Sequence, residues 1–243
     1  MLRTEFSNTV EKIINPKTEE EKKRLERIAK YINLLSEDEE ITADILEEKW
    51  DLKKLNTVTN EDGYFKEFVK ITDEEGTVTE TEIFYLLKGK QVSCLHALET
   101  TETWTWLGGE EISLFISTSQ GLKEIILNEN NSTYSIERGI LFGAKINNQK
   151  HDNDFGLVTC LCKPGFLPEH YKNPSPEEIN NLCITYPNHE EVIRALAPES
   201  KNNKNPIQSL IQFFTCCIGV RKIEDIEEQS SLIDTTQNNT NTI

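Results

Sequence analysis

The residues best suited to chemistry lie close together in the middle of the chain. His96 is followed six positions later by Glu102, and Trp104 and Trp106 come directly after it. An imidazole beside a carboxylate can act as a general acid or base, because the carboxylate orients the ring. Indole faces bind the C–H faces of sugars, bases and cations. These residue types indicate a site for a small polar ligand, with catalysis by His96 and Glu102 as a further hypothesis.

Short β-rich runs surround these residues and must position them. Gly, Asn and Asp break the runs, and no helical pattern separates them. Closely spaced strands of this kind predict an antiparallel sandwich or barrel and argue against a doubly wound sheet, which needs a helix between strands. The expected strands are Tyr64–Ile71, Val78–Leu87, Gln91–Leu98, Glu102–Trp106, Glu111–Ser117, Leu122–Leu127, Thr133–Ile136, Ile140–Ile146 and Phe155–Lys163.

Inward-facing residues alternate along the strands of a barrel. Glu102, Trp104 and Trp106 therefore share one strand face, and His96 lies on the preceding strand. If both faces point inward, the barrel holds a carboxylate, an imidazole and one or two indoles beside one another. The side chains expected to complete this wall are Tyr64, Glu67, Tyr85 and Phe142.

Helical spacing appears on both sides of the strand region. Apolar residues recur at helical intervals in residues 18–36, and a second helix is expected over Thr42–Leu55. Two short helices are expected around Pro176–Leu182 and His189–Leu196. The first helix is highly charged, and we expect it to pack on the barrel with a solvated face; a surface flap or a partner-binding element is the alternative.

Three domains follow from these patterns. Residues 1–41 form a charged helical extension, and residues 42–196 form the β-barrel domain. Residues 197–243 form a linker and a C-terminal extension, whose acidic and Asn/Thr-rich end is expected to be disordered.

Four motifs occur in an order that resembles one known family. They are Asp62-Gly63-Tyr64-Phe65-Lys66-Glu67, the strand from Thr81 to Leu87, the block from Ser93 through His96, Glu102 and Trp104 to Gly109, and Pro164-Gly165-Phe166. Over roughly residues 42–196 the chain resembles an uncharacterised single-domain cupin family (cupin family 5, domain of unknown function 985) of the RmlC-like group. The resemblance implies a mainly β fold, a jelly-roll double-stranded β-barrel with a ligand site inside, and a homodimer paired through sheet edges.

The resemblance also bears on metal binding. His96, Glu102 and Gly109 have the spacing of the first cupin motif, but Leu98 stands where its second histidine belongs. Phe142 replaces the histidine of the second motif. Two of four ligands remain, whereas transition metals usually take at least three protein ligands. We therefore expect neither a metal nor another cofactor.

A further departure lies before the first strand. The family usually reads H-P-E-G-G-Y-F there, and this chain has Thr59-Asn60-Glu61-Asp62-Gly63-Tyr64-Phe65. Polar groups of the family site have been lost, so a degenerate binding domain or a barrel kept as a scaffold is an alternative.

Bulk composition argues against several classes of binding partner. The formal net charge of −16 argues against nucleic acid and against adsorption on anionic lipid. No apolar run approaches the ~20 residues of a membrane span, and no secretory signal is visible, which favours the cytoplasm. Six cysteines without a CxxC pair fit free thiols in a reducing compartment.

Three functions remain open. The first is binding of a small polar ligand, such as a sugar or nucleotide sugar, in the barrel. The second is an epimerase- or isomerase-like enzyme that uses His96 and Glu102. The third is a non-catalytic interaction protein, and the acidic tail from Glu224 also suits an effector translocated by a bacterial pathogen. The pair Cys216-Cys217 could be lipidated and touch a membrane, although packing on the barrel is favoured.

Overall fold

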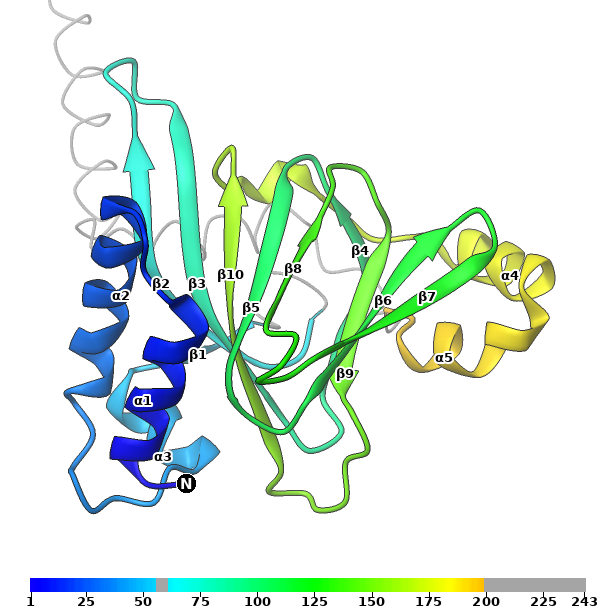
Figure 1. The fold of residues 1–243 in the computed structure, drawn as a ribbon. Helices are drawn as coiled ribbons and strands as arrows, with labels where there is room; N and C mark the ends of the chain where they lie inside the picture. The colour runs from blue at the N-terminus through cyan, green and yellow to red at the C-terminus, as the bar shows by residue number, and fades with distance from the viewer. Residues whose placement is uncertain (56–60, 199–243) are drawn as a thin grey trace, which may run out of the picture. The chain divides into compact units, whose positions relative to one another are not determined.

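Two antiparallel sheets form the centre of the fold (Figure 1). The computed structural model describes residues 1–55 and 61–198, which belong to one unit that spans Met1–Lys204. The six-stranded sheet has the order β1 (Lys53–Lys54), β2 (Tyr64–Thr72), β3 (Val78–Lys88), β10 (Phe155–Lys163), β5 (Thr101–Gly109), β8 (Thr133–Ile136). The five-stranded sheet has the order β11 (Tyr171–Lys172), β4 (Val92–Leu98), β9 (Phe142–Ile146), β6 (Ile112–Thr118), β7 (Gly121–Leu127).

This topology confirms the predicted fold class. The protein is mainly β, and each of the nine strands expected from the sequence is present with small shifts at its ends. Of the linker and C-terminal extension expected over 197–243, the structure describes only residues 197 and 198. The Cys216-Cys217 pair and the acidic tail therefore lie outside the described residues. No helix among the described residues is long and apolar enough to cross a membrane.

Three N-terminal helices cover the outer face of the six-stranded sheet. They are α1 (Arg3–Ile14), α2 (Glu19–Ile32) and α3 (Ala43–Lys49). Phe6, Ile28 and Trp50 of this layer share one buried apolar cluster with Phe84 and Leu107 of the sheet. The charged first predicted helix therefore packs on the barrel, and its polar face stays in solvent.

The helical extension expected over residues 1–41 contains a helix before residue 18 as well: α1 forms because Phe6, Val10 and Ile14 recur every four residues and bury one face. One local expectation for this layer was wrong. The helix expected over Thr42–Leu55 ends at Lys49. Asp51 adopts a left-handed backbone with φ of 53°, which terminates the helix before β1 begins.

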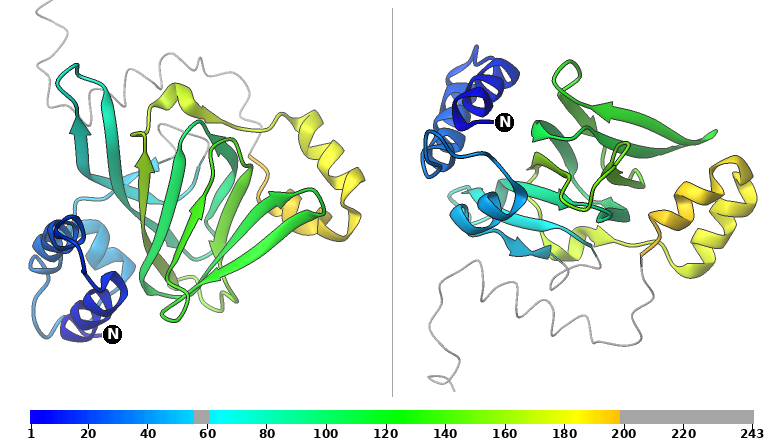
Figure 2. Two further views of the ribbon diagram at one scale, coloured as in Figure 1. Left: turned by 45° about the horizontal axis from the view of Figure 1, so that its top comes forward. Right: turned by 90° about the horizontal axis from the view of Figure 1, so that it is seen from below.

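The C-terminal helices cover a different surface. α4 (Pro176–Thr185) begins at a capping box of Ser175 and Glu178, and α5 (Glu190–Ala195) follows it. Ile179 and Ile193 pack on Phe115 of β6 and Leu122 of β7. Both views of Figure 2 show α4 and α5 next to β7 and away from α1 and α2. The helical layers thus leave the inner faces of the sheets to one another.

A bulge in β4 sets the direction of its side chains. Ser93 pairs with Ala144 and His96 pairs with Phe142, so three steps along β4 match two along β9. The extra residue turns Leu95 outward into the cluster with α4 and α5, while Ser93 and His96 both reach the inner network. Gly143 permits this, because a Cβ there would lie 2.9 Å from the Ser93 carbonyl oxygen.

Candidate functional site

A buried carboxylate, Glu61, holds the imidazole of His96. Glu61 Oε1 lies 2.9 Å from His96 Nδ1 and accepts a hydrogen bond of 3.0 Å from the Tyr171 hydroxyl. Glu61 Oε2 accepts a hydrogen bond from the Ser93 hydroxyl at 3.1 Å. The Tyr85 hydroxyl lies 3.4 Å from the same oxygen and has the Asp62 carbonyl as its nearer acceptor, at 2.8 Å. Both oxygens of this carboxylate therefore have partners within the network.

The position of His96 fixes its tautomer. Its Nδ1 faces two oxygen acceptors, Glu61 Oε1 and the Cys94 carbonyl at 2.7 Å, so Nδ1 carries a proton. Nε2 is therefore the nitrogen that gains or loses a proton when the ring titrates. Burial lowers the pKa of His96, but the charge and hydrogen bond of Glu61, with a contribution from Glu102, outweigh burial and raise the pKa to about 8.

Glu102 lies on the inner side of β5 and is incompletely satisfied. Burial raises its pKa, and the nearby His96 and Trp104 offset that effect only in part. Among the described atoms, Glu102 Oε2 and Trp104 Nε1 are buried without a hydrogen-bond partner. Buried polar atoms are nearly always paired in folded proteins, and an unpaired one calls for an explanation. The Trp104 side chain nevertheless lies close enough to lower the pKa of Glu102 by hydrogen bonding, so this donor and this acceptor are neighbours that lack good hydrogen-bond geometry.

Aromatic rings enclose these groups. His96 stacks on Tyr171 at a centroid distance of 4.9 Å and packs against Phe142 at 4.2 Å. Trp104 meets Tyr85 and Phe142 edge to face, at 5.7 and 6.2 Å. These rings exclude water, so charges and hydrogen bonds at the site are stronger than they would be in solvent.

The structure brings together five of the eight side chains predicted for the site. His96, Glu102, Trp104, Tyr85 and Phe142 meet in this network. The other three lie elsewhere. Tyr64 points to the opposite face, into the cluster under the N-terminal helices, with the Lys88 ammonium 5.2 Å from its ring centre.

Glu67 and Trp106 take peripheral positions. Glu67 pairs with Ile83 in the ladder between β2 and β3, is half-buried, and has a pKa raised by burial. The Trp106 indole donates to the Glu110 carbonyl at 2.9 Å, so its polar atom is already used. Neither side chain contacts His96 or Glu102 through any described hydrogen bond, ion pair or ring contact.

The residues do not fit the metal site of the wider superfamily. Leu98 and Phe142 have no ligand atoms, and His96 Nδ1 is committed to Glu61 and the Cys94 carbonyl. Within the described ranges, no three His, Cys, Asp or Glu side chains form a group that could hold a metal ion.

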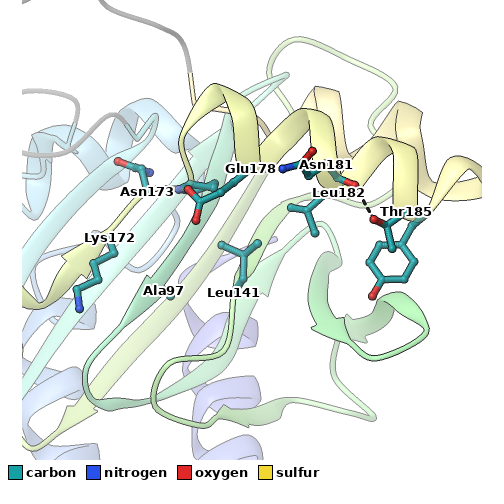
Figure 3. A pocket seen from close by; sticks show the side chains of 10 residues that line it. Ala97, Leu141, Lys172, Asn173, Glu178, Asn181, Leu182 and Thr185 are labelled. Atoms are coloured by element: carbon teal, nitrogen blue, oxygen red, sulfur yellow. Dashed lines mark hydrogen bonds between the residues drawn. The ribbon is translucent and has the colours of Figure 1, made fainter.

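A hollow of about 520 Å³ lies beside α4, on the outer side of β4 (Figure 3). Ala97, Leu141 and Leu182 supply apolar surface, and Asn173 lies at the edge nearest the network. The Asn173 amide donates to the Tyr171 hydroxyl at 3.0 Å and to the Leu95 carbonyl at 3.2 Å. Asn173 therefore connects this hollow to the residue that covers His96.

Comparison with known families identifies the fold family. The profile described as "Cupin superfamily (DUF985)" matches residues 48–173, more than half of the chain. The protein belongs to this cupin family, as its motifs predicted. No curated protein gave a significant match.

Two solved structures have a similar fold. A hypothetical protein from Leishmania major shares 25% identity at a TM-score of 0.53, and the match covers 65% of this chain and 100% of that one. A protein from Shewanella oneidensis shares 22% identity at a TM-score of 0.55, covering 65% and 98%. The match to each leaves about a third of this chain outside the common fold.

Three members of the network, Glu61, Ser93 and Tyr171, were missed from the sequence. Glu61 is the residue that matches the glutamate of the family block H-P-E-G-G-Y-F, and that match was the available signal. Tyr171 carries no local signal, since β11 contains only two residues. Its place beside His96 depends on the pairing of Tyr171 with Leu98 of β4.

Proposed function

We propose that this protein binds a small polar organic ligand inside the barrel, at Glu102, Trp104 and His96. The observation that carries the proposal is the pair of unpaired buried atoms, Glu102 Oε2 and Trp104 Nε1. Leaving such atoms unpaired costs about 1–3 kcal/mol each, and a ligand with hydroxyl groups would remove that cost. Aromatic walls with a few polar groups are typical of small-molecule sites, including those for sugars and nucleotide sugars.

Access to this site runs past Tyr171. The strand that carries Tyr171 has two residues and pairs with β4 at one edge of the sheet. Short edge elements open locally at low free-energy cost. Displacement of Tyr171 would uncover one face of the His96 ring without breaking either main sheet.

Native mass spectrometry of the full-length protein tests the proposal. We expect a retained organic molecule, and its mass released on denaturation identifies the ligand class. His96→Ala and Trp104→Phe should each weaken binding of that ligand about tenfold or more, whereas Glu124→Gln, an exposed change on β7, should leave binding unchanged. Equal binding by the parent and both site variants would refute the assignment of the site.

A second candidate is an epimerase- or isomerase-like reaction, favoured by the geometry of His96. Its Nδ1–H is clamped by Glu61, its Nε2 titrates with a pKa of about 8, and the ring therefore exchanges protons near neutral pH. Incorporation of solvent deuterium into a panel of sugars and nucleotide sugars measures this activity. Exchange no faster than that of His96→Ala would rule it out.

We also propose a cytoplasmic homodimer that pairs through a sheet edge. The support is that β7, seven residues long, ends the five-stranded sheet with one unpaired edge among the described strands. Light scattering coupled to size-exclusion chromatography should give twice the chain mass. Ile125→Pro, in the middle of β7, should shift the protein to monomer if this edge forms the interface.

A further inference from the structure

A short segment between β10 and α4 covers His96. Tyr171 of this segment lies on β11, stacks on the His96 ring at a centroid distance of 4.9 Å and keeps part of its own surface in solvent. His96 behind it is only 4% exposed. Tyr171 is therefore the layer that separates one face of this imidazole from solvent.

Residues 167–174, which include Tyr171, are held less firmly than the chain on either side of them. None of these residues is fully buried, and β11 contributes only two residues to one edge of its sheet. Before the segment, the Phe166 N–H donates to Thr81 Oγ1 at 2.9 Å. After it, Ser175 caps α4, whose Ile179 packs in a buried apolar cluster. The segment thus lies between two fixed ends, and segments with so little burial open locally at low free energy.

Two side chains of the segment reach inward. The Tyr171 hydroxyl donates to Glu61 Oε1 at 3.0 Å, and the Asn173 amide donates to the Tyr171 hydroxyl at 3.0 Å. The same amide donates to the Leu95 carbonyl of β4 at 3.2 Å. Asn173 therefore ties Tyr171 to the sheet and directs the proton of its hydroxyl towards Glu61.

The contacts on the outer side of the segment are weaker. Lys172 forms an ion pair with Glu99, but the lysine side chain is 62% exposed, and exposed pairs contribute little to stability. The Glu99 N–H donates to the His170 carbonyl at 3.1 Å, beside the pairing of β11 with β4. Tyr171 and Asn173 therefore supply most of the closing interaction, because a bond to a buried carboxylate is stronger than an exposed one.

We propose that residues 167–174 form a lid over His96, that Tyr171 and Asn173 latch this lid, and that its opening regulates access to the barrel. Opening breaks the pairing of β11 with β4 and the bonds of the two latch residues, and it leaves both main sheets intact. The inference rests on the proposed binding function and concerns its access step. A ligand that enters only through the open lid is bound more weakly in proportion to the fraction of open protein.

Reaction of the histidines with diethyl pyrocarbonate at pH 7 reports opening of the lid in the full-length protein. Peptide mass spectrometry locates the modified residues, and the exposed His151 gives the reference rate. We expect His96 to react at least about tenfold more slowly than His151, since the reagent reaches it only in the open state. Equal rates at the two histidines would show that no lid covers His96.

Two variants release the latch. Tyr171→Phe keeps the stacked ring and loses the bond to Glu61, whereas Asn173→Asp keeps the side-chain shape and loses both donated bonds. Each should raise the reaction rate of His96 about tenfold. The matched controls are Tyr186→Phe and Asn181→Asp, which change residues of the hollow beside α4 that lie outside the lid. If the latch variants react no faster than these controls, the latch is wrong.

Hydrogen exchange in low urea separates lid opening from unfolding. The Glu99 amide is bonded to the His170 carbonyl of the lid, so its exchange reports opening and does not depend on the ionisation of His96. We expect Glu99 to exchange at least about 100-fold faster than the amides of β5 and β10, and with little dependence on urea, because opening exposes little surface. Exchange of Glu99 with the rate and urea dependence of β10 would show that His96 is uncovered only by unfolding.

The lid and the proposed binding function can fail independently. If His96 and Glu99 behave as expected and native mass spectrometry finds no retained ligand, the lid stands and the binding function is wrong. If a retained ligand is identified, Tyr171→Phe and Asn173→Asp should speed its association. Association at the rate of the parent in both variants would show that the lid does not regulate access.

Discussion

At the scale of single residues, the site is defined by an imidazole between two buried carboxylates. Glu61 is surrounded by His96, Tyr171, Tyr85 and Ser93. Glu102 has one oxygen without a hydrogen-bond partner among the described residues. The first carboxylate therefore positions the ring. Residues arranged for binding rather than for stability commonly keep such unfavourable contacts.

The raised pKa of His96 makes stability depend on pH. A histidine whose pKa rises from 6.5 to about 8 on folding stabilises the folded state fully below pH 6.5, and this contribution is lost as the pH rises through 8. The loss should amount to about 2 kcal/mol. Burial raises the pKa of Glu102 as well. Ionisation of Glu102 therefore also lowers the stability of the folded state as the pH rises above 4.5.

Urea unfolding between pH 6 and pH 9 measures this dependence. His96→Gln removes the titrating group and should flatten the profile between pH 6.5 and 8.5. His151→Gln, an exposed histidine in the loop before β10, is the matched control and should leave the profile unchanged. A parent protein with constant stability across that range would contradict the assignment of the charge to His96.

At the scale of elements, one bulge decides which side chains of β4 face the site. Gly143 of β9 packs against that bulge. A Cβ added at Gly143 would lie 2.9 Å from the Ser93 carbonyl oxygen. Gly143→Ala should destabilise the protein by about 1–3 kcal/mol, the usual cost of overpacking. Urea unfolding measures this, with Glu124→Ala on the exposed face of β7 as the control. An unchanged midpoint would show that the bulge relaxes freely.

The ion pair between α2 and the six-stranded sheet fixes how the helix layer docks. Arg24 reaches Glu82 at 2.6 Å, and its guanidinium also donates to Thr159 at 2.7 Å and Thr105 at 3.2 Å. Arg24→Met should cost about 3 kcal/mol, because Glu82 is then buried without a cation. The double variant Arg24→Met/Glu82→Met should return to within about 1 kcal/mol of the parent.

A double-mutant cycle by urea unfolding checks this prediction. Lys12→Met/Glu129→Met removes an exposed ion pair of 2.6 Å and is the matched control, with an expected effect below 1 kcal/mol. If Arg24→Met is as mild as that control, the pair does not direct docking of the helix layer.

At the scale of the whole described unit, the helix layer and the sheet share one apolar core. Trp50 lies between Phe6 of α1 and Phe84 of β3. Two such layers with a common core unfold together, because neither can keep its buried face without the other. The helices that lie mostly outside the family match are therefore part of the same cooperative structure.

Trp50→Ala tests this cooperation. We expect a loss of about 3–5 kcal/mol, typical of truncating a buried aromatic residue, in a single transition seen alike by far-ultraviolet circular dichroism and by fluorescence of Trp104 and Trp106. Leu34→Ala, an exposed change in the same layer, should cost less than 1 kcal/mol. Separate transitions for helices and sheet would contradict a shared core.

The sequence by itself determined the strands and the family. Alternation and turn residues are local signals, so Val78–Lys88 or Ile112–Thr118 can be recognised without knowing their partners. Only the tertiary structure decided that Glu61 and Tyr171 meet at His96 and that Tyr64 faces the helices. Strand register and the bulge in β4 set which face each side chain takes, and both depend on contacts between residues distant in the chain.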